Sequence, residues 1–197
     1  MNYEFFVRQR EPGYQGFFRL DRLHIRHELF AGGYADIVRE CFERGNAAAV
    51  IPYDPVVDKI VMVEQFRVGG IGSPGGPWMV EVVAGIVEPG ESPEAVVRRE
   101  MVEESGCKLI ALEEIGDFVL SPGGCSERIF LFCGRVDASQ ASGIHGLADE
   151  GEDIRVLSVE FEEAMHWLQS GKVKSAISII SLQWLALNRQ ELRARWL

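Results

Sequence analysis

The sequence lacks the features of a disulfide scaffold, a structural-zinc domain or a membrane protein. Its 197 residues include four cysteines, with no CxxC pair and no regular spacing, so we expect reduced thiols and no structural zinc. No apolar run approaches the ~18 residues needed to span a bilayer. The segment MNYEFFVRQREPGYQ lacks the basic-then-apolar order of a signal peptide. These absences together predict a cytoplasmic protein without a membrane partner.

Basic residues are also scarce. The chain has 20 Lys and Arg against 30 Asp and Glu, and its formal net charge is -10. Nucleic-acid binding needs clustered Lys and Arg against the phosphates, so we expect no nucleic-acid partner. A small anionic substrate would need a cation to mediate its binding. The length and the 47% hydrophobic content fit one globular domain with at most a small appended element.

Strand-like segments lie on both sides of one helix-like segment. Residues 1–45 predict a small antiparallel β element, broken at EPGYQG and AGG. Residues 46–197 predict an α/β domain with a mixed sheet, whose strands we expect at AAAVIPYD, KIVMVEQFR, WMVEVVAG, IGDFVL, RIFLFCGRV and IRVLSVE. Two helices are expected at FEEAMHWLQSG and KSAISIISLQWLALNRQELRARWL. The loop RVGGIGSPGGP has no GK[ST] ending, which favours a mobile connector over a phosphate-binding loop.

The segment GESPEAVVRREMVEESG, residues 90–106, predicts a helix with clear ends. Ser92 is a suitable N-cap, Pro93 suits the first helical position, and Gly106 suits a left-handed stop. On a helical wheel, the arc expected to pack on the core consists of Ala95, Val97, Met101 and Val102. A separate arc carries Glu100, Glu103 and Glu104 with Val96 among them.

Three glutamates at i, i+3 and i+4 repel one another, which costs a few tenths of a kcal/mol per pair. Arg99 precedes Glu103 by four residues and relieves part of this repulsion. In an arbitrary helix such a face is usually solvated. The alternative is that a cation lies between the carboxylates, and the spacing alone leaves both interpretations open.

These residues form the pattern G-x5-E-x7-R-E-x-x-E-E-x-G, which resembles the Nudix box of the Nudix hydrolase family. The box is complete over residues 85 to 107, and its seven fixed positions are Gly85, Glu91, Arg99, Glu100, Glu103, Glu104 and Gly106. Pro122, fifteen residues past the box, and the surrounding SPGGCSER are similar to the bacterial ADP-ribose diphosphatase subfamily. So are EQFR, EVVAG, GIHGLADEGEDIRV and ISIISLQWLAL.

The resemblance implies a Nudix-type α/β/α sandwich that hydrolyses the diphosphate bond of ADP-ribose to AMP and ribose 5-phosphate. It also implies Mg²⁺ as the cofactor, with Mn²⁺ as a possible substitute, and a homodimer formed through residues 1–45. The physical chemistry agrees, because the charge of a diphosphate repels a nucleophile and a hard cation held by carboxylates neutralises that charge.

The resemblance also implies roles for single residues. The metal ligands would be the carbonyl of Ala84 and the carboxylates of Glu100, Glu103, Glu104 and Glu152. Glu150 aligns with the general base, and Glu103 is the next candidate for that role. Gly85 and Gly106 would allow a tight turn and a helix stop, while Glu91 and Arg99 would brace the loop against the helix.

Substrate contacts are implied for Phe17, Arg39, Arg67 and Ser121. Phe17 would lie against adenine and Arg39 near the substrate across the dimer, while Arg67 would contact a phosphate. By composition alone, Phe17 is a core residue, both arginines are surface charges, and ADEGED is a solvated loop.

Two other function classes stay open on the sequence. A Nudix enzyme could act on GDP-mannose, on another nucleotide sugar or on a dinucleotide cofactor, because the box is shared and only flanking motifs discriminate. A non-catalytic nucleotide-sensing module usually has lost box carboxylates, and here none is lost.

Overall fold

The computed structural model describes residues 3–197, which divide into two compact units. The smaller unit comprises the segment that ends at Asn46 together with Val119–Arg128. The larger unit comprises Ala47–Phe118 and Ile129–Leu197. The sequence did not indicate that residues 119–128 belong with the N-terminal segment.

The smaller unit is built on a three-stranded antiparallel sheet in the order β1-β2-β3. Its strands are β1 (Phe5–Gln15), β2 (Arg19–Glu28) and β3 (Tyr34–Glu43). The expected break at EPGYQG is wrong, because β1 continues through Pro12 and Gly13. The β1–β2 register shifts between Pro12 and Tyr14, and such a bulge accommodates a proline in an edge strand.

The larger unit contains a mixed eight-stranded sheet with the main order β10-β11-β5-β4-β9-β8. β4 pairs in parallel with β9 and antiparallel with β5. The six strands are β4 (Ala47–Asp54), β5 (Lys59–Phe66), β8 (Ala111–Val119), β9 (Arg128–Arg135), β10 (Ile144–His145) and β11 (Ile154–Glu160). All eight residues of β4 are buried, which marks it as a central strand covered on both faces.

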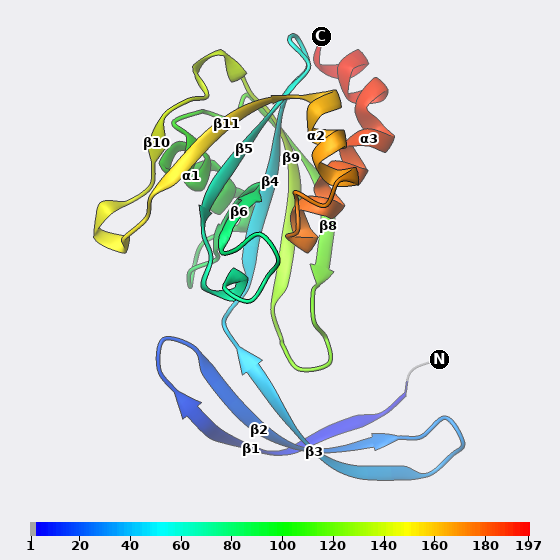
Figure 1. The fold of residues 1–197 in the computed structure, drawn as a ribbon. Coiled ribbons are helices and arrows are strands. Elements are labelled where there is room, and N and C mark those ends of the chain that lie inside the picture. Colours follow the sequence, from blue (N-terminus) through cyan, green and yellow to red (C-terminus); the bar gives the residue numbers. More distant parts are fainter. Residues whose placement is uncertain (1–2) are drawn as a thin grey trace. The chain divides into compact units, whose positions relative to one another are not determined.

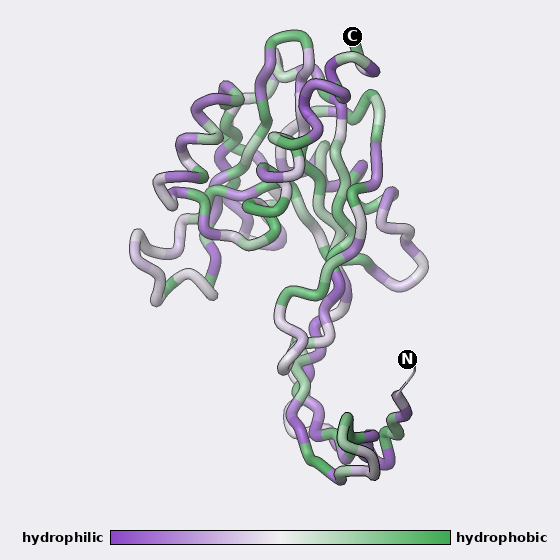
Figure 2. Tube along the Cα trace, turned by 90° about the vertical axis from the view of Figure 1, so that its right-hand side faces the viewer, coloured by the Kyte–Doolittle hydropathy of each residue, from purple (hydrophilic) through white to green (hydrophobic). Residues whose placement is uncertain are grey.

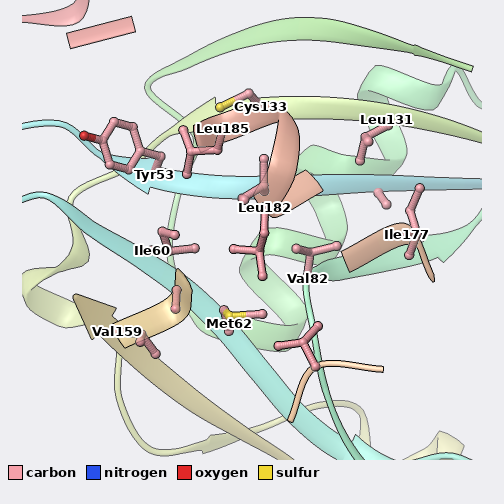
Figure 3. Packing of buried hydrophobic residues seen from close by; sticks show 14 of the residues in the cluster. Tyr53, Ile60, Met62, Val82, Leu131, Cys133, Val159, Ile177, Leu182 and Leu185 are labelled. Carbon is pink, nitrogen blue, oxygen red and sulfur yellow. The ribbon is translucent and has the colours of Figure 1, made fainter. Parts of the chain in front are cut away.

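Helices cover both faces of this sheet, as Figure 1 shows. The helices are α1 (Pro93–Ser105), α2 (Phe161–Gln169) and α3 (Ala176–Trp196). Alternate residues of β4 enter two separate cores, because successive side chains of a strand point to opposite faces. Tyr53 packs in one core with Leu182 and Leu185 of α3 (Figure 3), whereas Val50 packs in the other with Met101 of α1. The expected α/β/α sandwich is confirmed.

The segment WMVEVVAG, expected as one strand, forms two. β6 (Trp78–Glu81) pairs with β5, and β7 (Val83–Ile86) pairs with β4. The chain therefore crosses from one strand to its neighbour at Val82, which is buried. This crossing brings β7 against α1 and leaves β6 beside the glycine-rich loop.

Hydrophobic residues concentrate along the strands of the larger unit in Figure 2. Within residues 3–197, none of the helices has the length and the apolar character required to cross a membrane.

Candidate active site

The ends of α1 match the sequence prediction. The Ser92 hydroxyl accepts a hydrogen bond from the backbone N–H of Ala95 at 3.2 Å, and Pro93 begins the helix. Gly106 ends it with φ of 68°, a conformation that glycine adopts without a Cβ penalty. The helix is therefore fixed at both ends, and its side chains have defined directions.

The face that α1 turns to the sheet differs from the expected apolar arc. Val97 and Met101 are buried as expected, but Val102 is 45% exposed and Val96 is fully buried. Glu104 is only 2% exposed. The acidic face therefore turns toward the sheet rather than away from it.

Gly85 in β7 makes room for this arrangement. A Cβ atom added at Gly85 would lie 1.8 Å from Oε1 of Glu100, so that carboxylate occupies the space a side chain would need. A helical wheel of α1 cannot show this space, because the missing side chain is that of Gly85 in β7. The small residues of β7 let a carboxylate approach the backbone closely.

Glu104 lies at the deepest point of the acidic face. Its Oε1 accepts from Nε2 of Gln65 and its Oε2 from the backbone N–H of Ala84, each at 3.4 Å. Burial and the nearby carboxylate of Glu100 raise the pKa of Glu104 to about 8. The ionised form of this group is therefore costly unless a cation accompanies it.

Arg99 relieves the charge among the outer carboxylates. Its Nη1 donates to Glu100 at 2.8 Å and to Glu103 at 2.9 Å. Its Nη2 lies 3.3 Å from Oε2 of Glu91. The hydrogen bond from Arg99 lowers the pKa of Glu91. Arg99 thus joins the loop before α1 to the acidic face, where the sequence analysis placed it.

The loop between β10 and β11 packs against the C-terminal end of α1. The N–H of Gly146 donates to the carbonyl of Glu103 at 3.1 Å. The ring of His145 lies over Gly106, where an added Cβ would meet Cε1 at 2.7 Å. Oε2 of Glu152 accepts from the N–H of Leu147 at 3.0 Å. The loop therefore carries Glu152 toward the carboxylates of α1.

A hollow of about 280 Å³ lies beside the acidic face. Its lining residues are Gln65, Phe66, Arg67, Trp78, Glu150, Gly151, Glu152 and Asp153. Nε of Arg67 donates to Oε2 of Glu81 at 2.6 Å, which fixes the guanidinium. Glu150 ends the short helix Ala148–Glu150, and its carboxyl has no partner within residues 3–197. The structure thus brings Arg67, Glu150 and Glu152 together.

The donor set fits a hard cation. The pKa of Glu104 is raised partly by the charges of Glu100 and Glu152, so these three carboxylates act on one another. Oxygen ligands of this kind are those that Mg²⁺ prefers. Within residues 3–197 no three of them converge as a ready cluster. Protein donors engage the carboxylates of Glu100, Glu103, Glu104 and Glu152 instead.

Three predicted site residues belong to the smaller unit. Phe17 is 87% exposed and packs edge-on against Phe18, so the alternative that it is a core residue is wrong. Nη1 of Arg39 donates to the carbonyl of Val38 at 2.8 Å. The carbonyl of Ser121 accepts from the N–H of Cys125 at 2.9 Å. Their proposed contacts with substrate stay predictions.

No role was predicted for Gln65, Trp78 or Glu81, although all three lie at the site. Gln65 and Glu81 lie inside EQFR and EVVAG, two segments that carry the family resemblance. Gln65 is 5% exposed, and a buried polar side chain in a strand signals a specific partner. The pairing of Trp78 with Phe66 depends on strand register and had no local signal.

Together, a carboxylate face, an adjacent arginine and an acidic loop define a site suited to metal-assisted hydrolysis of a phosphate anhydride. The model of the NUDIX domain family matches residues 43–177, and the chain belongs to that family.

Two of the similar relatives are ADP-ribose pyrophosphatases. An ADP-ribose pyrophosphatase of Escherichia coli strain K12 is 49% identical over 188 residues, which are 95% of this chain and 90% of the relative. An ADP-ribose pyrophosphatase of Haemophilus influenzae is 48% identical and covers 93% of this chain and 86% of the relative. A GDP-mannose pyrophosphatase of Cronobacter sakazakii is 38% identical, and the match covers 76% of this chain and 78% of the relative.

A solved structure described as an ADP compounds hydrolase aligns with a TM-score of 0.70. The alignment covers 98% of this chain and 96% of that structure, with 18% sequence identity. At this identity the likeness concerns the fold.

Proposed function

We propose that the protein hydrolyses the diphosphate bond of ADP-ribose to AMP and ribose 5-phosphate with Mg²⁺ as the cofactor. The observation that carries the choice of substrate is the 49% identity to an ADP-ribose pyrophosphatase over 95% of the chain. Similarity to a GDP-mannose pyrophosphatase is lower and covers 76% of the chain.

The metal would be held by Glu100, Glu103, Glu104 and Glu152, with the carbonyl of Ala84. When bound, Mg²⁺ neutralises charge on the diphosphate and acidifies a water molecule. Glu104 contributes a buried, fixed carboxylate, since its two oxygens meet Gln65 and the Ala84 amide. Arg67, held by Glu81 at 2.6 Å, orients a phosphate oxygen in the hollow.

Glu150 is the general base in this proposal. Carboxylates that bind a cation accept protons poorly, because the positive charge lowers their basicity. Glu150 lines the hollow and has no partner within residues 3–197, so its carboxylate can accept a proton from water. The water oxygen then forms a bond to one phosphorus atom, and the bond from that phosphorus to the bridging oxygen breaks.

The smaller unit would form a homodimer and contribute to substrate binding. Its exposed aromatic side chains include Phe5 at 69%, Phe17 at 87% and Phe30 at 90% exposure. Apolar surface of this extent in a small sheet is typical of a protein interface. Phe17 and Arg39 would contact the substrate from the partner, and Ser121 from its own loop. Such an enzyme would work in the cytoplasm, where its nucleotide substrate occurs.

The experiment is a phosphate-release assay with Mg²⁺ and a coupled phosphatase, which acts on AMP and ribose 5-phosphate but not on intact diphosphate esters. ADP-ribose is expected to give the highest kcat/KM, above GDP-mannose and dinucleotide cofactors. A preference for GDP-mannose would overturn the substrate assignment. Tight binding of ADP-ribose in calorimetry without turnover would instead support a sensing module.

A further inference from the structure

The crossing between β6 and β7 lies close to two parts of the site. Glu81, the partner of Arg67, immediately precedes Val82, and Ala84 follows it by two residues. The Ala84 N–H meets Glu104, and Gly85 faces Glu100. A shift of the chain at Val82 would therefore displace the arginine and the carboxylate contacts together.

The backbone at Val82 leaves the sheet ladders. Glu81 is the last residue of β6 paired with β5, and Val83 is the first of β7 paired with β4. Val82 is 1% exposed, so its N–H cannot rely on water. A buried amide without a partner is costly, and the crossing needs an acceptor from elsewhere.

Ser178 supplies that acceptor from the opposite side of the sheet. Its hydroxyl oxygen accepts from the N–H of Val82 at 3.0 Å, although the two residues are 96 positions apart. Ser178 lies in the first turn of α3 and is fully buried. Figure 3 shows the side chain of Val82 beside Ile177, in the core that α3 forms with the sheet.

We propose that Ser178 is a positioning residue for the carboxylate site, acting through the backbone of Val82. It fixes where β7 begins, and through β7 it fixes the Ala84 amide and carbonyl and the space at Gly85. α3 thereby determines the geometry of a site on the other face of the sheet. The assignment rests on the proposed metal-dependent function and adds a residue that never contacts metal or substrate.

Ser181 offers a matched control, because it is a fully buried serine one turn later in the same helix. Its hydroxyl donates to the carbonyl of Ile177 at 2.7 Å and so bonds within the helix. Loss of either hydroxyl removes one buried hydrogen bond. Only the Ser178 hydroxyl connects to the β6–β7 crossing.

The test measures Mn²⁺ binding to the full chain by calorimetry, together with kcat, KM and melting temperature. Ser178→Ala should weaken Mn²⁺ binding and lower kcat by about tenfold each, a typical loss when a residue behind a metal ligand is removed. Ser181→Ala should leave both within about twofold, since its bond lies within the helix. Ser178→Cys should be intermediate, because a thiol is a weaker acceptor.

Equal Mn²⁺ affinity in Ser178→Ala and Ser181→Ala, at similar melting temperatures, would overturn the proposal. If Ser178→Ala does not fold, Ser178→Cys decides, and wild-type Mn²⁺ affinity in that variant overturns it too. A wild-type protein that binds Mn²⁺ but leaves ADP-ribose intact would refute the proposed function alone, because the binding series still tests Ser178.

Discussion

The carboxylate of Glu104 and the side-chain amide of Gln65 face each other in the interior, with 3.4 Å between Oε1 and Nε2. One residue comes from the acidic helix and the other from β5, the strand that ends one residue before Arg67. An amide can donate to a carboxylate but cannot neutralise it. When Glu104 is ionised, the pair therefore leaves a buried negative charge that only a cation would balance.

The metal-free protein should lose stability as the pH rises from about 4.5 to about 8. Burial and Glu100 raise the pKa of Glu104 to about 8 from the ordinary value of 4.5. Between these values the folded chain keeps a proton that the unfolded chain releases, so the free energy of unfolding falls with pH. Each pKa unit is worth about 1.4 kcal/mol, giving a total of a few kcal/mol.

Glu104→Gln should flatten this pH dependence and melt higher than the wild type at pH 8 in EDTA. Thermal denaturation from pH 5 to 8.5 measures both effects. Glu94→Gln is the control, because Glu94 lies on the same helix but pairs on the surface with Arg98 at 2.9 Å. Parallel curves for Glu104→Gln and the wild type would contradict the prediction.

Gly85→Ala should weaken metal binding while the fold persists. The added Cβ would lie 1.8 Å from Oε1 of Glu100, so that carboxylate must move. Because a glutamate side chain can rotate away, we expect a loss of about 1 to 3 kcal/mol in stability. The dissociation constant for Mg²⁺ should rise at least about tenfold.

Calorimetric titration with Mg²⁺ and a melting curve measure these two quantities. Gly69→Ala is a matched control, since a Cβ at Gly69 would have nothing within 4 Å. An unchanged Mg²⁺ affinity in Gly85→Ala would show that Glu100 can leave this position without consequence for the site.

Much of the site was accessible to sequence analysis because its signals are local. The caps at Ser92 and Gly106 and the carboxylate spacing all lie within one helix. The direction of the acidic face was not accessible, since it depends on Gly85 in another strand. A helical wheel assigns the hydrophobic arc to the core, so it could not predict that the charged Glu104 is only 2% exposed.

The strand break at Val82 was inaccessible for a related reason. WMVEVVAG is uniformly suited to a strand, and only the separate pairing of β6 with β5 and β7 with β4 divides it. Ser178, whose hydroxyl accepts from the N–H of Val82, lies 96 positions away in the sequence. Phe17 and Arg39 were predicted from the resemblance, because an exposed aromatic and a surface arginine carry no local signal of a ligand.

The protein should sediment as a dimer at micromolar concentration, with twice the 22.0 kDa of one chain. The exposed side chains of Phe5 and Phe30 are the apolar surface that a partner would cover. Combined Phe5→Asp and Phe30→Asp substitutions should shift the sedimentation equilibrium toward monomer and lower kcat/KM for ADP-ribose. Leu187→Asp is the control, because Leu187 is 85% exposed on α3 of the larger unit. A fully active monomer would remove the basis for shared contacts by Phe17 and Arg39.

Substitutions of Glu150 and of Glu152 should have different effects in a magnesium titration of the reaction rate. Glu152 accepts from the Leu147 N–H and raises the pKa of Glu104, which places its charge among the carboxylates. Glu152→Gln should therefore raise the Mg²⁺ concentration needed for half-maximal rate. Glu150 lines the hollow without a partner within residues 3–197, so Glu150→Gln should lower kcat by about 10²- to 10⁴-fold while Mg²⁺ and ADP-ribose affinity stay near wild type.

Asp149→Asn provides the control for both variants, because Asp149 is exposed in the same short helix and does not line the hollow. The Asp149→Asn variant should keep a wild-type rate and a wild-type Mg²⁺ response. The substitution removes a negative charge but no side chain that lines the hollow. A base that acts mainly in the transition state cannot be replaced by added metal. Full recovery of Glu150→Gln at high Mg²⁺ would therefore make Glu150 a ligand, and Glu103, already within 2.9 Å of Arg99, would become the base to test.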